Sequence, residues 1–162
     1  RGEYFFIRKQ YLDAEDAYGS IIKMGSTSSY YELALYKQGW SLYKQDRYRE
    51  SLEVFVSILD RELPVGAVEN LEATLEVIPR AQRELVRDVL RVVALAFSQI
   101  GGGPALTEFL GEREPRSYEP VLYANLAELF IDKERINDAA AAFYGLAERS
   151  QTPPDSAACH KD

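Results

Sequence analysis

Residues 34–59 read ALYKQGWSLYKQDRYRESLEVFVSIL, and the organisation of the whole chain can be worked out from them. Apolar residues recur three and four positions apart on both sides of Asp46 and Arg47, a spacing typical of two amphipathic helices. We therefore predict one helix over about 30–45 and a second over 48–61, joined by a tight turn. Short helices joined by so few residues pack as an antiparallel pair.

The rest of the 162-residue chain has the same helical character. Leucine, alanine, glutamate, lysine, arginine and glutamine fill most segments, and proline and glycine separate them. No segment alternates apolar and polar residues in the manner of a strand, so the predicted class is all-α. The remaining helices are expected at residues 1–9, 12–24, 67–77, 81–100, 104–110, 120–132 and 136–149.

The pair around Gly39 recurs along the chain. Its marks are a small residue in the first helix, a Tyr or Ile at the turn, a small residue three positions later and an aromatic four positions after that. The three sets are Gly39, Tyr48, Ser51 and Phe55; Ala127, Ile136, Ala139 and Phe143; and Gly2, Tyr11, Ala14 and Tyr18. We expect the small residues to let the helices approach, the turn residue to plug their junction and the aromatic to fill the space towards the next unit. One such pair cannot bury its apolar face alone, so the units must stack.

This spacing resembles the tetratricopeptide repeat, a helix–turn–helix unit of about 34 residues. Residues 34–59 are the best copy, 122–147 are a good copy, and 92–110 are a degenerate copy with Ala94 in the small position. The usual tryptophan and leucine of the first helix become Leu35 and Gln38. The resemblance implies a right-handed solenoid of about three to four units in a single domain over residues 1–150. The units are expected near 1–24, 30–61, 86–111 and 119–149, with an insertion near 62–80 and a flexible tail over 151–162.

In this family the first helices of the pairs commonly line a concave groove that binds a peptide or a partner helix. Carried over to this chain, the groove candidates are Phe6, Tyr36, Lys37, Trp40, Tyr43, Lys44, Arg91, Gln99 and Glu128, with Asp132 beside the last. Tyr36, Trp40 and Tyr43 share one helix face by their spacing, and large aromatics beside lysines suit a binding interface. The alternative is that this stripe packs on a neighbouring helix. A carboxylate clamp is not favoured, because its available cations come from units separated by the insertion.

The composition points away from an enzyme and from nucleic-acid binding. The chain carries 19 basic and 26 acidic residues, a net charge of −7 that repels phosphates. Its single cysteine and single histidine, Cys159 and His160, lie in the polar tail, so we expect no disulfide, no metal site and no cofactor. Gly101–Gly103 lacks the Lys-Ser/Thr of a phosphate loop and is interpreted as a helix end. The acidic residues of the insertion are interpreted as a solvated helix face: Glu69, Glu72 and Glu76.

The ends of the chain and a softer likeness complete the expectations. The sequence starts at Arg1 without a methionine, and we interpret it as a fragment of a larger protein. No apolar run approaches the roughly 20 residues that span a bilayer, so no membrane insertion is expected. Residues 31–60 and 83–97 resemble parts of long bacterial repeat proteins of the cell envelope, which implies a periplasmic or envelope-associated scaffold. The partner would be a protein or peptide; alternatively, the units form a spacer that stacks on further repeats or self-associates.

Overall fold

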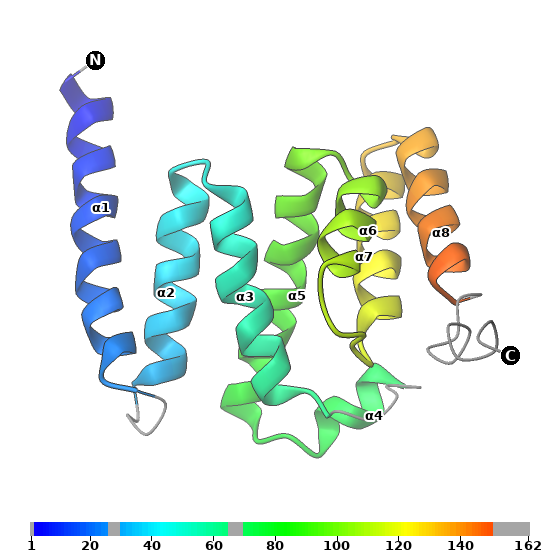
Figure 1. Ribbon diagram of the computed structural model, residues 1–162, viewed down its shortest axis with the longest axis horizontal. Coiled ribbons are helices and arrows are strands. Elements are labelled where there is room, and N and C mark those ends of the chain that lie inside the picture. The colour runs from blue at the N-terminus through cyan, green and yellow to red at the C-terminus, as the bar shows by residue number, and fades with distance from the viewer. Residues whose placement is uncertain (1, 26–29, 65–69, 151–162) are drawn as a thin grey trace, which may run out of the picture. The chain divides into compact units, whose positions relative to one another are not determined.

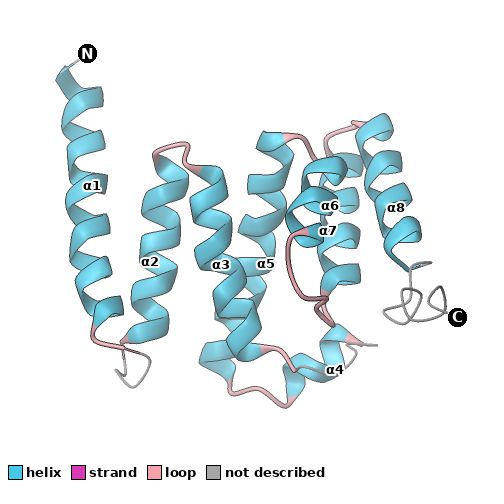
Figure 2. Cartoon of the chain, viewed as in Figure 1, coloured by secondary structure: helices cyan, strands magenta, loops and turns pink. Residues whose placement is uncertain are grey.

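The computed structural model describes residues 2–25, 30–64 and 70–150, and only the backbone of residues 2–7. The described chain is all-helical, without a strand, which confirms the predicted class (Figures 1 and 2). The predicted tail over 151–162, with Cys159 and His160, lies outside the described residues. The helices are α1 (Gly2–Lys23), α2 (Tyr31–Lys44), α3 (Tyr48–Glu62), α4 (Leu71–Glu76), α5 (Arg80–Ile100), α6 (Gly103–Gly111), α7 (Glu119–Asp132) and α8 (Ile136–Ser150).

The chain divides into two compact units, residues 1–96 and 97–162, with the boundary inside α5. In the N-terminal unit α1 packs on α2, and α2 packs on α3 (Figure 1). In the C-terminal unit α7 packs on α8, and α6 packs on both of them. This division does not test the predicted single domain over residues 1–150, which stays a prediction.

Three turns share one geometry, the Schellman motif that ends many helices with a left-handed residue. They join α2 to α3, α5 to α6 and α7 to α8. The left-handed residues are Asp46, with φ 59°, Gly101, with φ 128°, and Glu134, with φ 58°. In each turn the next N–H bonds back to a carbonyl five residues earlier: Arg47 to Leu42 at 3.0 Å, Gly102 to Phe97 at 2.8 Å and Arg135 to Phe130 at 2.8 Å. The three helix pairs therefore share one backbone register at their turns.

The predicted small residues keep that register. Gly39, Ala94 and Ala127 each lie seven positions before the left-handed residue, and all three are buried. A Cβ atom added at Gly39 would lie 2.7 Å from the Phe55 ring, so the helices approach too closely for a side chain there. The Ser51 hydroxyl donates to the Gly39 carbonyl at 2.9 Å, which closes the crossing of α2 and α3.

The prediction of two helices over 1–9 and 12–24 is wrong, because α1 runs unbroken from Gly2 to Lys23. No glycine, proline or capping residue separates Lys9 from Leu12, so the helical hydrogen bonds continue through this stretch. Tyr11 consequently lies within a helix and not at a turn. Residues 2–23 are one long helix packed on α2, not a helix–turn–helix pair.

The expected role of Ile136 as a plug at the turn is wrong, because its side chain is 62% exposed. Phe143 of α8 is 47% exposed, and its expected packing towards a next unit stays a prediction. The buried seam of α8 consists of Ala139, Ala142 and Gly145. A Cβ added at Gly103 of α6 would lie 2.9 Å from the Ala142 backbone, and one added at Gly145 would lie 2.8 Å from the Tyr123 ring. Small residues thus bring α8 against α6 and α7, and this seam turns Ile136 and Phe143 outwards.

The helix of the insertion is shorter than the predicted span of 67–77. It begins at Leu71 because the Asn70 side chain accepts from the Ala73 N–H at 3.2 Å as an N-cap. Residues 65–69, which include Glu69, lie outside the described residues. Glu72 is exposed but forms an ion pair of 2.8 Å with Arg87 of α5, so solvation alone does not account for it.

Candidate functional site

A row of aromatic rings runs along one face of α2. Tyr36, Trp40 and Tyr43 contact one another edge to face, with ring centroids 6.5 Å apart for the first two and 5.3 Å apart for the second two. Tyr48, the first residue of α3, continues the row at 5.2 Å from Tyr43. All four rings are half-buried. We call these four residues the aromatic row.

Phe55 of α3 supports the row from beneath. This ring is fully buried, and its centroid lies 6.3 Å from Tyr36 and 6.2 Å from Trp40. The alternative prediction, that these rings pack on a neighbouring helix, therefore holds for the side of Trp40 that faces Phe55 of α3. The ring is nevertheless only half-buried, so its other side remains available to solvent.

Three exposed cations border the aromatic row. The Lys44 ammonium and the Arg91 guanidinium each lie within 6 Å of the Trp40 ring centroid, at 5.8 Å and 5.9 Å. The Lys37 ammonium lies 5.9 Å from the Tyr36 ring. These distances allow cation–π attraction, which is strongest for tryptophan. The structure thus brings together six of the predicted residues: Tyr36, Lys37, Trp40, Tyr43, Lys44 and Arg91.

Asp88 of α5 completes this surface, and the sequence analysis missed it. The Tyr36 hydroxyl donates to one carboxylate oxygen of Asp88, and Arg91 donates to the other at 2.7 Å. Partial burial alone would raise the pKa of Asp88, but the hydrogen bonds from Tyr36 and Arg91 and the charge of Arg91 hold it below its ordinary value. Burial and the bond to Asp88 raise the pKa of Tyr36. The spacing of Asp88 and Arg91, three positions apart on a helix, was the signal that could have found the pair.

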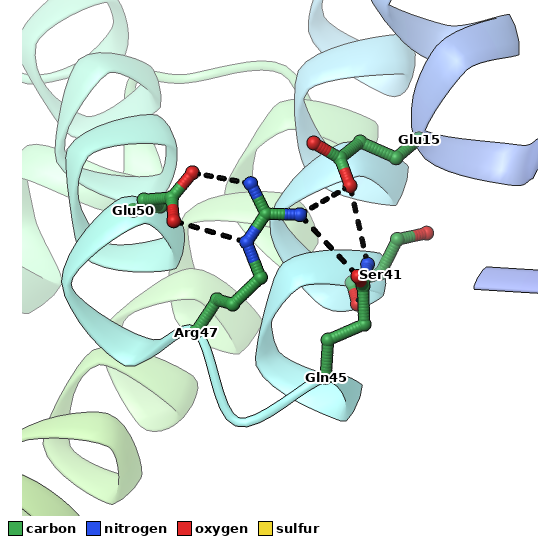
Figure 3. Close-up of polar contacts among 5 residues, drawn as sticks. All are labelled: Glu15, Ser41, Gln45, Arg47 and Glu50. Atoms are coloured by element: carbon green, nitrogen blue, oxygen red, sulfur yellow. Dashed lines mark hydrogen bonds and ion pairs between the residues drawn. The ribbon is translucent and has the colours of Figure 1, made fainter. Parts of the chain in front are cut away.

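A second polar cluster centres on Arg47 at the α2–α3 turn (Figure 3). Its guanidinium donates to Glu15 of α1 at 2.6 Å and forms a two-pronged pair with Glu50 of α3 (Figure 3). Gln45 donates to Glu15 at 3.3 Å and to the Ser41 carbonyl at 3.0 Å. The hydrogen bond with Glu50 raises the pKa of Arg47 and lowers that of Glu50. This cluster fastens α1 to the turn, so we assign it a structural role.

Two carboxyl groups lie at the end of α2 and α3 that is opposite the α2–α3 turn: Glu32 in the first turn of α2 and Glu62 at the end of α3. Burial, and then the hydrogen bond and negative charge of Glu32, raise the pKa of Glu62 to about 7. Arg61 pairs with Glu32 at 3.1 Å and covers the Tyr31 ring at 4.7 Å. Protonation of Glu62 relieves its repulsion from the charge of Glu32.

The other predicted site residues lie elsewhere. The side chain of Phe6 is outside the described portion of the chain, although its backbone belongs to α1. Gln99 and Glu128 are exposed residues of the C-terminal unit, whereas the six residues brought together on α2 and α5 belong to the N-terminal unit. Among the described residues, no cluster of His, Cys, Asp and Glu could hold a metal ion. None of the described helices alone is long and apolar enough to cross a membrane; α5 and α6 together meet that test by length and composition, but they bend by 107° where they join.

No family model matches the chain, and neither a curated protein nor a solved structure is detectably similar to it.

Proposed function

We propose that this chain is a non-enzymatic repeat module that binds a peptide or a partner helix on the α2 surface. The observation that carries the proposal is the aromatic row, whose rings are half-buried and bordered by three exposed cations. Large rings that keep one apolar side and a polar tip in reach of solvent are the side chains that dominate binding hot spots. A row supported by the buried Phe55 ring also loses little conformational freedom when a partner covers it.

Two features support a tetratricopeptide-like solenoid as the framework of this module. The three helix pairs share the register of their turns and of their small residues. The bond from Tyr36 to Asp88 joins α2 to α5, which are the first helices of two successive pairs. In a solenoid of this family, those helices would line the concave groove, and the aromatic row would lie on its wall.

The test is partner capture with two single variants, Trp40→Ala and Tyr43→Ala. Wild type and variants are used as bait for the soluble and membrane fractions of source cells, since the resemblance implies an envelope-associated scaffold. Tyr144→Ala is the matched control, because Tyr144 is 67% exposed and belongs to α8 of the C-terminal unit. We expect both α2 variants to lose the partner and the control to retain it, with unchanged helical circular dichroism.

Binding that survives both α2 variants in folded protein would contradict the proposal. Trp40→Ala also removes contacts with Tyr36 and Phe55, so loss of folding is a real outcome for that variant. Tyr43→Ala keeps the test decisive, because Tyr43 has no described ring contact with Phe55 and borders the turn.

A second candidate function, a spacer that stacks on further repeats or self-associates, is favoured by the outer face of α8. Ile136, Phe143 and Tyr144 are exposed there, together with Ala140. Light scattering over a range of protein concentrations would show a rising mass for a self-associating spacer. The rise should disappear in Phe143→Ser/Tyr144→Ser, and a constant monomer mass would count against self-association.

A further inference from the structure

We propose that the partner segment is acidic, with two carboxylates that flank one apolar side chain. The inference rests on the proposed binding function and adds the chemical class of the partner.

The surface already binds one carboxylate of its own. Asp88 accepts from the Tyr36 hydroxyl and from Arg91, so the charge of Arg91 is matched within the protein. This arrangement shows that the donors at the edge of the aromatic row hold a carboxylate beside the Trp40 ring. Carboxylates form strong, charge-assisted hydrogen bonds with donors such as the tyrosine hydroxyl and the arginine guanidinium.

Lys37 and Lys44 are the two cations of this surface whose charge no described acidic residue matches. Within the described residues, neither Lys37 nor Lys44 forms an ion pair; each ammonium lies over a ring of the aromatic row. Asp46, at the turn beside the row, accepts from the Tyr48 hydroxyl at 2.9 Å. In a chain with net charge −7, this surface is a local reversal of sign, so it favours an acidic partner over a basic one.

The spacing of the lysines sets the spacing of the partner's carboxylates. Lys37 and Lys44 are seven residues apart on one helix, which is roughly 10 Å along its axis. Trp40 lies between them. A partner that places an apolar side chain against Trp40 would therefore offer one carboxylate to each side. In an extended peptide that distance corresponds to acidic residues about three positions apart.

The experiment selects random twelve-residue peptides, displayed on phage, against the full 162-residue chain. Selected sequences are synthesised with blocked ends, so that a terminal carboxylate cannot supply the charge. We expect the selected peptides to share two acidic residues about an apolar one, and to lose binding to Tyr43→Ala. In Lys37→Gln/Lys44→Gln, affinity should fall roughly tenfold, and the wild-type affinity should fall similarly between low and high salt.

The matched control is Lys9→Gln/Lys133→Gln, which changes the net charge equally by neutralising two exposed lysines on α1 and after α7. It should bind like wild type. Peptides that need Tyr43 but are not acidic, or that bind the Lys37/Lys44 variant at full strength, would overturn the inference and leave the proposed function standing. Failure to select any peptide that needs Tyr43 would overturn both.

Discussion

Gly39 marks the tightest point in the packing of α2 on α3. An added Cβ would meet the Phe55 ring at 2.7 Å, closer than carbon atoms pack, and Phe55 is itself enclosed by Tyr36 and Trp40. The ring cannot yield without disturbing the underside of the aromatic row. The repeat pattern in the sequence predicted the small residue, and the structure supplies the reason for it.

We expect Gly39→Ala to lower the free energy of unfolding by about 2 kcal/mol, because overpacking exceeds the helix-forming advantage of alanine. Gly111→Ala is the matched control: it is the last residue of α6, and nothing lies within 4 Å of an added Cβ. That substitution should be neutral or stabilise the protein by up to about 1 kcal/mol. Urea unfolding measures both, and equal midpoints for the two variants would contradict the packing argument.

Glu62 gives the protein a dependence on pH near neutrality. Its folded pKa, about 7, is above the ordinary value of 4.5, so between these values the folded state binds more protons than the unfolded state. The contribution of Glu62 to stability is therefore fully present below pH 4.5 and is lost as pH rises through 7.

Glu62→Gln removes this loss. We expect the variant to be more stable than wild type at pH 8, by about 1 kcal/mol after allowance for solvent screening of a half-buried group. At pH 5 the two proteins should unfold at similar urea concentrations. Thermal or urea unfolding across this pH range measures the difference, and a constant gap at every pH would show that Glu62 does not titrate as described.

Helix α1 packs on α2, and Arg47 fastens it to the α2–α3 turn. The Arg47–Glu15 ion pair is 2.6 Å long, with the two side chains 33% and 20% exposed (Figure 3). Replacing Arg47 with methionine keeps the apolar stem of the side chain but removes this pair, which should weaken the docking of α1 by about 1 kcal/mol. We expect amide hydrogen exchange in α1 to accelerate roughly fivefold, while exchange in α3 stays near its wild-type rate.

Arg135→Met is the matched control, because Arg135 occupies the same position in the α7–α8 turn. It pairs with Asp138, three residues later, and so makes no described contact with α1. Exchange in α1 should not change in this variant. Unaltered α1 exchange in Arg47→Met would mean that apolar packing alone holds the helix.

Local chemistry made most of these elements predictable. The turn between α2 and α3, the glycines after α5 and the two C-terminal helices were all found from spacing and from helix-ending residues. The predicted turn near Tyr11 was wrong because it was based on a tyrosine at the position of Tyr48 in the repeat pattern. No residue that ends a helix lies beside Tyr11. The contact of Asp88 with Tyr36 joins residues 52 positions apart, so only the folded structure reveals it.

Taken as a whole, the chain has two packing units that share a single helix. Since α5 runs through the boundary, with residues 80–96 in one unit and 97–100 in the other, disruption of either unit removes packing from part of that helix. In repeat proteins, stability is a sum of local terms and neighbour terms, and a helix shared between two units makes the neighbour term large. We therefore expect one cooperative unfolding transition.

Arg149→Met tests this coupling. Arg149 pairs with Glu119 at 2.7 Å, and Glu119 is only 7% exposed, so the substitution should destabilise the C-terminal unit by about 2 kcal/mol. Trp40, the single tryptophan, reports on the N-terminal unit, whereas far-ultraviolet circular dichroism reports on all helices. Both signals should shift to the same lower urea midpoint. Unshifted tryptophan fluorescence beside a biphasic circular dichroism curve would show that the units unfold independently.

The Schellman turns make the connections between helices interchangeable. Gln45 and Lys133, which end α2 and α7, have nearly identical backbone angles, φ −91° and ψ 9° against φ −90° and ψ 7°. The residues that follow them, Asp46 and Glu134, differ in φ by only one degree. An exchange of these three-residue joints would alter side chains and leave the path of the chain as it was. For a protein engineer, each joint is a defined site at which helices can be recombined into hybrid chains without redesign of the backbone.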